Sequence, residues 1–210
     1  MKVFGYQTLY GMKGLPNNKR FLSFCLAQMN IDQHWLADAN RIISPNYDLR
    51  PTPADISLLV IHCISLPPAE FGNGYIDQLF CNRLNPDDHD YFKALQQLKV
   101  SAHVLVKRSG DITQYVPFDK RAWHAGQSCY QGRERCNDFS IGIELEGTES
   151  IAYTDAQYQQ LTAVVKALLK TYPNLSTGRI TGHSDIAPGR KTDPGPSFDW
   201  QRLAGLLKNG

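Results

Sequence analysis

A short segment near the end of the 210-residue chain pairs a histidine with an aspartate ten positions later. It runs from His183 to Asp193 and reads HSDIAPGRKTD, and its Pro and Gly predict a loop without helix. Imidazole and carboxylate groups are both good zinc ligands, and a catalytic zinc takes three protein ligands and keeps a fourth position for water. One more ligand must therefore come from elsewhere in the chain.

The third ligand is predicted at the end of a buried strand. Residues 56–62 read ISLLVIH, a mostly aliphatic run that ends in His62. Ligands of α/β proteins bind outside the carboxyl ends of the strands. His62 and His183 each stand where a strand gives way to a loop with Gly or Pro, so we expect both to bind metal. Two ordinary hydrogen-bonded histidines are the alternative.

The other four histidines are weaker candidates for ligands. His34 lies in a predicted helix and His89 in a charged stretch, and we expect both at the surface. His103 begins a predicted strand and is either a core residue or a partner of a metal ligand. His124 lies in a loop of small residues and can line a substrate pocket.

Two aspartates compete for the carboxylate position, because Asp185 and Asp193 both lie near His183. Spacing alone does not choose between them. Asp185 also suits a cap or turn, a common role of aspartates in loops. The Pro-Gly-Pro that follows Asp193 stiffens its backbone, and we therefore predict Asp193 as the ligand.

A zinc ion with this ligand set lowers the pKa of its bound water toward ~7 and polarises a carbonyl, which suits amide hydrolysis. Such a site also needs a base that orients or deprotonates the attacking water. It needs a cation that stabilises the negative charge developing on the carbonyl oxygen. Glu144 and Glu146 alternate with aliphatic residues, so both point to one face and one of them can face the metal; alternatively both are solvated. Lys191 is close enough to Asp193 to reach the same carbonyl, unless it is an ordinary surface lysine.

The elements that position these residues predict an α/β fold, a mixed central sheet of about five strands flanked by helices. Helices are predicted over residues 35–43, 88–98 (capped by Asp87 or Asp88), 154–171 and 198–207. Strands are predicted over residues 56–62, 102–108, 111–116, 139–147 and 178–182, the second and third forming a hairpin. The Pro-, Gly- and Asn-rich region 63–90 is expected to form a wall of the site.

Composition narrows the class of protein. The hydrophobic fraction of 42% and charged fraction of 20% are typical of one globular domain. A net charge of +2 is too small to favour nucleic acid or a membrane surface as partner, and no stretch approaches the roughly 20 apolar residues of a membrane span. Five cysteines without a CxxC pair favour free thiols in the cytoplasm.

Residues 1–28 are expected to be a poorly packed extension, and residues 29–210 to form the catalytic domain. The extension shows no sustained periodicity, and Met29 opens what we interpret as the folded region. A signal peptide is the alternative, because Lys19 and Arg20 precede an apolar run. That basic pair is far from the amino terminus, and no A-x-A-like cleavage site follows.

Four longer motifs resemble the type-2 N-acetylmuramoyl-L-alanine amidase family. They are VIHCISLPPAEFG, VSAHVLVKRSGDITQYVPFDKRAWHAG, YQGRERCNDFSIGIELEG and TGHSDIAPGRKTDPGP, and they occur in the same order from about Met29 to the last helix. They are most similar to the branch that acts on 1,6-anhydro-muramyl peptides in peptidoglycan recycling. The resemblance implies the fold shared with peptidoglycan-recognition proteins and phage T7 lysozyme. It also implies zinc-dependent cleavage of the amide bond between the anhydro sugar and the L-alanine of the stem peptide.

The resemblance also implies roles for single residues. By motif, the zinc ligands are His62, His183 and Asp193, the water-orienting base is Glu144, and the oxyanion stabiliser is Lys191. The family often has cysteine at the third ligand position, and the aspartate of this chain suits the recycling branch.

Substrate contacts follow less directly from the motifs. Cys63 stands where the family has asparagine, which removes one polar contact. Lys99 stands where arginine is expected, and either it or Arg135 can pair with a stem-peptide carboxylate, although only arginine offers bidentate geometry. Trp123 and Tyr75 can flank the sugar or peptide. Surface charge and core packing are the ordinary alternatives for these residues.

Two other classes of function compete with the amidase. A non-catalytic peptidoglycan-binding module on the same fold is expected to lack one or more ligands, and this chain lacks none. A cysteine hydrolase built on Cys63 or Cys129 lacks a recognisable nucleophile motif. We therefore predict a monomeric zinc amidase that acts on muropeptides in the cytoplasm.

Overall fold

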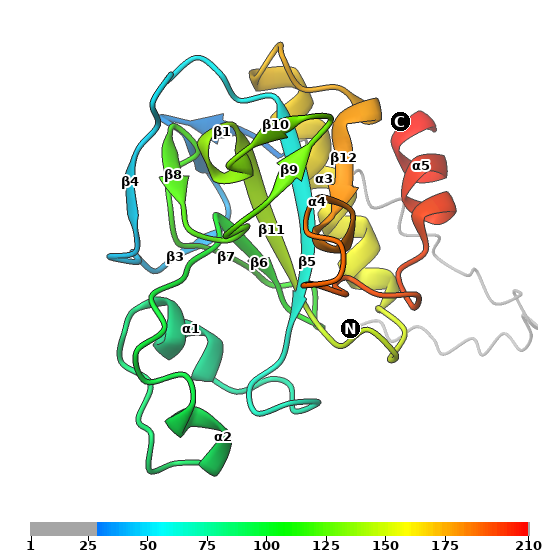
Figure 1. Ribbon diagram of the computed structural model, residues 1–210. Helices are drawn as coiled ribbons and strands as arrows, with labels where there is room; N and C mark the ends of the chain where they lie inside the picture. Colours follow the sequence, from blue (N-terminus) through cyan, green and yellow to red (C-terminus); the bar gives the residue numbers. More distant parts are fainter. Residues whose placement is uncertain (1–28, 210) are drawn as a thin grey trace, which may run out of the picture.

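The computed structural model describes residues 29–209, and a six-stranded mixed sheet forms its centre (Figure 1). In spatial order the strands are β12 (Ile180–Gly182), β5 (Leu58–Ile64), β11 (Ser140–Glu146), β6 (Val104–Val106), β7 (Ile112–Gln114) and β3 (Asn40–Arg41). The first four run parallel, β7 is antiparallel to β6, and β3 is parallel to β7. The predicted mixed sheet is confirmed, with β3 as the strand that the sequence pattern missed.

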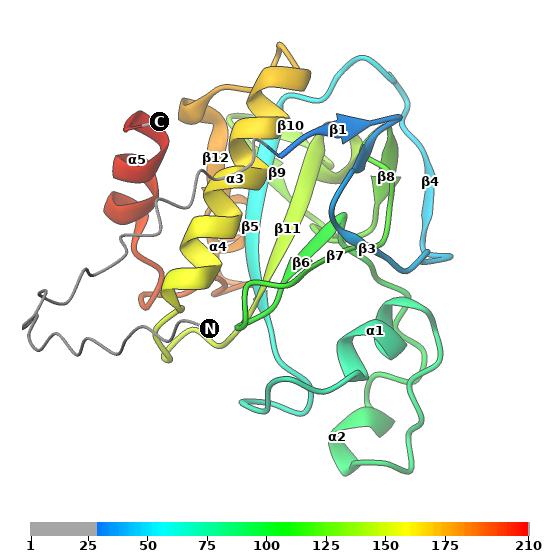
Figure 2. The ribbon, with the colours of Figure 1, turned by 180° about the vertical axis from the view of Figure 1, so that it is seen from behind.

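A long helix covers one face of this sheet. This helix, α3 (Asp155–Thr171), lies across the sheet, and α5 (Trp200–Lys208) packs beside α3, near the β12 edge (Figure 2). Thr154 begins α3 with a capping box, in which its side chain accepts from the Gln157 N–H and the Gln157 side chain accepts from the Thr154 N–H. The predictions of helices over 154–171 and 198–207 are confirmed.

The rest of the domain is built from short elements. Helices α1 (Tyr75–Phe80) and α2 (Asp90–Lys93) lie together below the carboxyl ends of β5 and β11 (Figure 1). The remaining short elements are β1 (Ile31–Asp32), β2 (Trp35–Leu36), β4 (Tyr47–Leu49), β8 (Lys120–Ala122), β9 (Cys129–Tyr130), β10 (Arg133–Glu134), η1 (Cys136–Asp138), η2 (Thr177–Arg179) and α4 (His183–Ile186).

Strand alternation decides which face of the sheet receives the reactive groups on β5. Leu59 and Ile61 are buried in the core beneath α3, while Leu58 and Val60 pack in a smaller cluster on the opposite face. Side chains along a strand alternate between faces. His62 therefore shares the face of Leu58 and Val60, away from α3.

The same alternation makes one face of β11 polar. Ile141, Ile143 and Leu145 belong to the core under α3. The residues between them point the other way and are Ser140, Gly142, Glu144 and Glu146. All of them are buried, so the alternative of solvated carboxylates is wrong for both glutamates.

The predicted helix over 35–43 is wrong. The segment forms β2 and β3, because Gln33 and His34 adopt positive φ and turn the chain into a β1–β2 hairpin. The Leu36 N–H donates to Gln114 Oε1 at 2.7 Å, and Asn40 pairs with β7. Tertiary pairing therefore overrides the helical spacing of the apolar residues.

Two further helix boundaries also differ from prediction. The helix over 88–98 is shortened to α2, and its N-cap is His89, whose Nδ1 accepts from the Tyr91 N–H at 3.0 Å. The segment from His183, predicted to be free of helix, begins with the single turn of α4. Asp185 accounts for that turn, because its side chain accepts from the Gly182 N–H at 2.9 Å.

The structure describes part of what was predicted for the amino-terminal extension and the cysteines. The poorly packed extension over 1–28, which includes Cys25, lies outside the described residues. The other four cysteines, Cys63, Cys81, Cys129 and Cys136, are free thiols. Within residues 29–209, none of the helices has the length and apolar character needed to cross a bilayer.

Candidate metal centre

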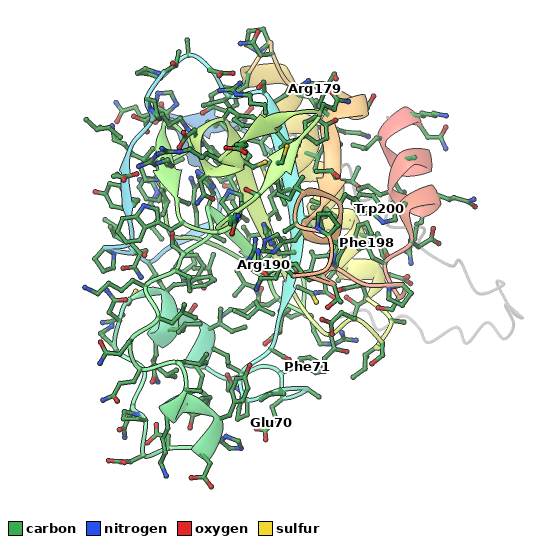
Figure 3. All side chains as sticks on the ribbon, viewed as in Figure 1. Glu70, Phe71, Arg179, Arg190, Phe198 and Trp200 are labelled. Atoms are coloured by element: carbon green, nitrogen blue, oxygen red, sulfur yellow. The ribbon has the colours of Figure 1, made fainter. Side chains whose placement is uncertain are left out.

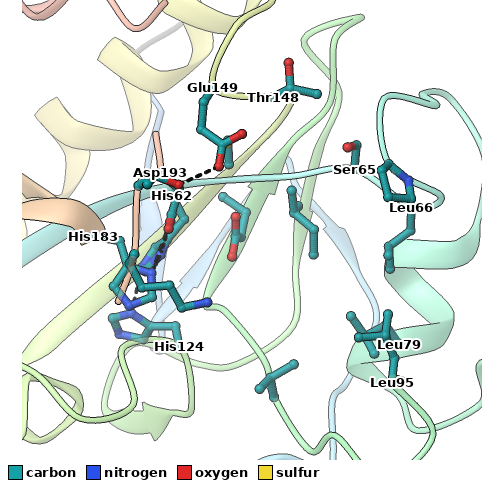
Figure 4. A pocket seen from close by; sticks show the side chains of 18 of the residues that line it. His62, Ser65, Leu66, Leu79, Leu95, His124, Thr148, Glu149, His183 and Asp193 are labelled. Carbon is teal, nitrogen blue, oxygen red and sulfur yellow. Dashed lines mark hydrogen bonds and ion pairs between the residues drawn. The ribbon is translucent and has the colours of Figure 1, made fainter. Parts of the chain in front are cut away.

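Three side chains from distant parts of the chain converge at the carboxyl end of β5. His62 Nδ1 lies 3.0 Å from His183 Nδ1 and 3.0 Å from Asp193 Oδ2, and His183 Nδ1 lies 3.1 Å from the same oxygen. All three residues are buried, and Figure 4 shows them gathered at one side of a pocket. Among residues 29–209 this is the group of His, Cys, Asp and Glu side chains arranged to hold a metal ion.

Each ligand candidate lies in a different segment, and Asp193 lies in the loop after α4. His62 lies in β5, two residues before the strand ends, and His183 is the first residue of α4. Asp185 closes the turn before His183 by accepting hydrogen bonds from Thr181 Oγ1 and the Gly182 N–H, both at 2.9 Å. Asp185 therefore acts as the cap that the sequence allowed, and Asp193 lies with the histidines.

The second nitrogen of each imidazole also has a partner. His183 Nε2 lies 3.1 Å from the Ala125 carbonyl oxygen, which can only accept, so His183 carries its proton on Nε2. His62 Nε2 lies 2.9 Å from His124 Nδ1. With the Nε2 protons directed outward, both Nδ1 atoms offer lone pairs to the same point, as metal-binding imidazoles do.

The ionisation of these groups suits a cation. Burial lowers the pKa of His62 to about 4, so its imidazole is neutral at neutral pH. Burial opposes ionisation of Asp193, but contacts with His183 and His62 outweigh it and hold the pKa of this carboxyl below its usual range. The neutral His62 imidazole and the Asp193 carboxylate are therefore both donors that suit a divalent cation.

The spacing also fits a small divalent ion. Tetrahedral zinc with bonds of about 2.0–2.2 Å separates its ligand atoms by about 3.3–3.6 Å. The three donor atoms here are 3.0–3.1 Å apart, so a few tenths of an ångström of adjustment would accommodate the ion. The residues present therefore fit a metal site with one position left for water or substrate.

Glu144 lies next to this centre on the neighbouring strand. It is the register partner of His62 across the β11–β5 pairing and is only 9% exposed. Its Oε2 is buried without a hydrogen-bond partner, and the residue lines the same pocket as the ligands. Burial and the charge of Asp193 raise the pKa of Glu144 well above its ordinary value, and perturbed pKa values of this kind are typical of carboxylates at functional sites.

Glu146, the other candidate on this strand face, has a different role. Its Oε1 accepts from the Gly72 N–H at 2.6 Å and its Oε2 from the Arg108 N–H at 3.0 Å. These bonds fasten the segment after β5 and the β6–β7 turn to the end of β11. The structure therefore separates a structural Glu146 from Glu144, whose carboxylate faces the pocket.

The pocket beside the metal centre has a volume of about 600 Å³. Lys191 lines it and is exposed, so its ammonium can reach a bound group. Across the pocket, an apolar wall comes from Leu66, Leu79 and Leu95 (Figure 4). These residues belong to the segment after β5, to α1 and to the turn after α2, so the region predicted to form a wall contributes to it.

Of the five predicted substrate-binding residues, one lines the pocket beside the metal ligands and one lines an adjoining pocket. His124 lines the pocket. Tyr75 packs on Phe92, with ring centroids 4.8 Å apart, and lies outside the pocket lining. Lys99, which is exposed, and Trp123, which is half-buried, are also not among the residues that line it.

Arg135 lies in an adjoining pocket of about 400 Å³. Its side chain is 71% exposed and lies 3.2 Å from Asp138. Arg190 lines both pockets, and Figure 3 shows it beside α4 and β5. Arg190 Nη2 donates to the Ala125 and Gln127 carbonyls at 2.7 and 2.6 Å.

Sequence reasoning missed several residues that contact the neighbours of the ligand candidates. Ser140 Oγ lies 3.1 Å from His124 Nε2, and Asn137 Oδ1 accepts from the backbone of the same loop. Ser140 has a detectable signal, since it shares the strand face of Glu144 by alternation. Asn137 and Arg190 carry no such signal, because their contacts depend on how two loops meet.

His103, left open between a core residue and a partner of a ligand, belongs to the core. It is fully buried, and its Nδ1 accepts from the Gly142 N–H at 3.0 Å. Its Nε2 is then the donor, and the Lys120 carbonyl lies 3.1 Å away. His103 therefore links β11 to β8 and does not contact a ligand candidate directly.

The thiol of Cys63 lines the pocket but is poorly suited to act as a nucleophile. Burial raises its pKa to about 12, so the group remains a thiol at neutral pH. Reactive cysteines need the opposite shift, toward thiolate. This property argues against a hydrolase built on Cys63.

Comparisons with known proteins identify the family of this chain. A family model described as N-acetylmuramoyl-L-alanine amidase matches residues 52–196. The 1,6-anhydro-N-acetylmuramyl-L-alanine amidase AmpD of Citrobacter freundii is 62% identical over 179 residues, which cover 85% of this chain and 95% of that protein. A crystal structure of a selenomethionine AmpD derivative matches with a TM-score of 0.83 and 62% identity, over 85% of this chain and 99% of that one.

A structure with bound substrate is also similar. The N-acetylmuramyl-L-alanine amidase AmiD from Escherichia coli, in complex with anhydro-N-acetylmuramic acid-L-Ala-D-γ-Glu-L-Lys, matches with a TM-score of 0.53. The identity is 30%, over 85% of this chain and 65% of AmiD. On the family match and the identity to AmpD, this chain belongs to the N-acetylmuramoyl-L-alanine amidase family.

Proposed function

We propose that this chain is a zinc-dependent amidase that separates 1,6-anhydro-N-acetylmuramic acid from L-alanine in muropeptides during peptidoglycan recycling. The observation that carries the proposal is the convergence of His62, His183 and Asp193 within 3.0–3.1 Å, beside a pocket that holds the unpartnered carboxylate of Glu144. The identity of 62% to an amidase named for this substrate supports the choice of the anhydro sugar.

Zinc is the metal that the donor set favours. Two imidazoles and one carboxylate are a ligand set of catalytic zinc sites, which keep one coordination position open. When bound there, zinc supplies Lewis acidity for the amide carbonyl and lowers the pKa of a coordinated water. His62, His183 and Asp193 would hold it.

Glu144 and Lys191 supply the remaining chemistry. As the water oxygen bonds to the lactyl carbonyl carbon, Glu144 accepts the released proton at its carboxylate and then transfers it to the L-alanine nitrogen as the C–N bond breaks. Lys191 Nζ donates to the carbonyl oxygen as negative charge develops on it. The products are a lactyl carboxylic acid on the sugar and a peptide with a free amino terminus.

The two pockets suggest how the rest of the substrate binds. The wall of Leu66, Leu79 and Leu95 offers apolar surface to the sugar ring or to alkyl parts of the peptide. Arg190 lines both pockets and Arg135 lines the adjoining one, so a stem peptide that extends from the first pocket into the second would meet both guanidinium groups. Guanidinium groups pair well with carboxylates. Tyr75, Lys99 and Trp123 remain candidates only if substrate binding moves them toward the pocket.

We place this activity in the cytoplasm and in a monomer. Free thiols, including the exposed Cys129, are common where the cellular environment is reducing. The three ligand candidates, Glu144 and Lys191 all come from one chain, so a single copy supplies the complete set. Cell fractionation with a tagged protein tests the location, and light scattering after size-exclusion chromatography tests the monomer.

The deciding experiment is mass analysis of the products formed from anhydro-muropeptide. The purified protein should release the intact stem peptide and 1,6-anhydro-N-acetylmuramic acid when loaded with zinc, but not after chelation, and added zinc should restore the activity. The same peptide on ordinary N-acetylmuramic acid is the matched substrate that measures preference for the anhydro sugar. Full activity in a protein shown to contain no metal would contradict the proposal.

A further inference from the structure

The ring of His124 lies between His62, a ligand candidate, and Ser140 on strand β11. Its Nδ1 is 2.9 Å from His62 Nε2, and its Nε2 is 3.1 Å from Ser140 Oγ. Ligation through His62 Nδ1 leaves the His62 proton on Nε2, so His124 Nδ1 must accept it. His124 then carries its own proton on Nε2, where Ser140 Oγ accepts it.

The sheet is shaped to receive this ring. Gly142 lies between Ser140 and Glu144 on the polar face of β11, and a Cβ at this position would lie only 2.4 Å from His124 Cγ. No side chain can therefore occupy position 142 while the ring keeps its place. The missing side chain leaves room for the ring beside the strand, where it reaches His62 through Nδ1 and Ser140 through Nε2.

The residue after His124 contacts the other histidine of the centre. The Ala125 carbonyl accepts from His183 Nε2 at 3.1 Å. Asn137 holds this pair of residues in place, because its Oδ1 accepts from the His124 N–H at 3.2 Å and from the Ala125 N–H at 2.8 Å. Two adjacent residues thus contact the outer nitrogens of both imidazoles, and one side chain fixes their backbone.

We propose that His124 is a positioning residue for the metal centre, acting with the Ala125 carbonyl to set the tautomer and orientation of both histidine ligands. Asn137 positions this support. The inference rests on the proposed metal site and assigns His124 a role through His62, in addition to lining the pocket. Outer hydrogen-bond partners of this kind typically change metal affinity by about 10- to 100-fold when they are removed.

A matched pair of substitutions at His124 tests the proposal. His124→Asn can place its amide oxygen near the position of the imidazole Nδ1 and keep an acceptor for His62, whereas His124→Leu keeps bulk but offers none. We expect His124→Leu to bind zinc about 10- to 100-fold more weakly in competition with a chromophoric chelator. The visible absorption of the cobalt-substituted protein should also change, while His124→Asn should remain closer to the wild type in both measurements.

The outcomes separate this inference from the proposed function. A wild-type protein that binds neither zinc nor cobalt would overturn the proposed metal site itself. Wild-type zinc affinity and an unchanged cobalt spectrum in a folded His124→Leu protein would overturn the positioning role alone. Thermal unfolding of the metal-free variants shows whether each one is folded.

A second pair keeps the test decisive even where His124→Leu does not fold. Asn137→Asp retains an acceptor oxygen for both N–H groups, and Asn137→Ala removes it. We expect zinc affinity to fall in Asn137→Ala and to be largely retained in Asn137→Asp. Equal zinc affinity and equal cobalt spectra in these two variants and the wild type would contradict the proposed support.

Discussion

Glu144 is the register partner of His62 across two adjacent parallel strands, so a buried carboxylate lies directly beside a candidate metal ligand. Neither residue depends on a loop for its position, because both lie within the central strands β5 and β11. The sheet therefore fixes the distance between the proposed metal and the proposed base, which is the geometry that water activation requires.

Replacing Glu144 by glutamine should leave zinc bound and reduce turnover. The amide keeps the shape of the side chain but does not accept the proton of the attacking water, and general bases contribute about 10²- to 10⁴-fold to rate. Zinc content per chain and kcat on anhydro-muropeptide measure the two effects. Stoichiometric loss of zinc from this variant would instead make Glu144 a structural partner of the centre.

Replacing Lys191 by alanine should lower kcat by about 10²- to 10³-fold, the range found when one oxyanion-stabilising donor is removed. Lys191→Arg keeps the charge and should recover part of the rate. Lys170, exposed near the end of α3, is the matched control, and Lys170→Ala should behave as the wild type. Equal kcat in Lys191→Ala and the control would remove Lys191 from the mechanism.

The two aspartates near His183 should respond differently to substitution. Asp193→Asn should lose zinc, because the oxygen shared by both histidines is no longer anionic. Asp185→Asn should keep zinc, and Asp185→Ala should lower the unfolding free energy by about 1 kcal/mol through loss of a cap. Zinc analysis measures the first effect and chemical denaturation the second. Retention of zinc by Asp193→Asn would show that Asp193 is not the carboxylate ligand.

Gly142→Ala should destabilise the protein, since the added methyl group meets the His124 ring. Overpacking of this kind costs about 1–3 kcal/mol, and displacement of the ring should also weaken zinc binding. Gly205 in α5 is the matched control, because a Cβ there meets nothing within 4 Å. Gly205→Ala is expected to be neutral or to stabilise by about 0.5–1 kcal/mol. Similar unfolding free energies for the two variants would show that the strand tolerates a side chain at 142.

Part of the acid sensitivity of the fold should come from Asp48. Hydrogen bonds from Arg121 hold the pKa of Asp48 below its usual range, with Nε to Oδ1 and Nη2 to Oδ2 distances of 2.6 Å. The folded state therefore binds this proton less readily than the unfolded chain. The pair stabilises the fold above the unfolded-state pKa of about 4, and this contribution disappears as the pH falls through the lower folded-state pKa.

Asp48→Asn tests that contribution. The Asp48 side chain is 42% exposed, so solvent screening limits the contribution to at most about 1 kcal/mol. The variant should unfold more easily than the wild type at about pH 7, and the difference should shrink at about pH 3. An equal difference in unfolding free energy at both pH values would mean that ionisation of Asp48 is not its source.

The long strands and helices were predicted most accurately from the sequence. The alternating residues of β11 and the capping box of α3 are local patterns, and each predicts its element because the same residues that form it also pack its core. The predicted helix over 35–43 was wrong because contacts with distant residues decide the structure of this region. Its apolar spacing is helical, but positive φ at Gln33 and His34 and pairing with β7 direct it into strands.

Residue type, spacing and family resemblance were enough to predict the chemistry of the site, because metal ligands and bases must be particular side chains. The predicted residues are His62, His183, Asp193, Glu144 and Lys191, and their convergence in the fold is compatible with the predicted roles. Tertiary structure decided what surrounds them. Glu146 holds two loops through hydrogen bonds, and His124 lies next to His62, because both roles depend on contacts between segments that lie far apart in the chain. The cap formed by Asp185 is a local contact with the Gly182 N–H, so the sequence could suggest it.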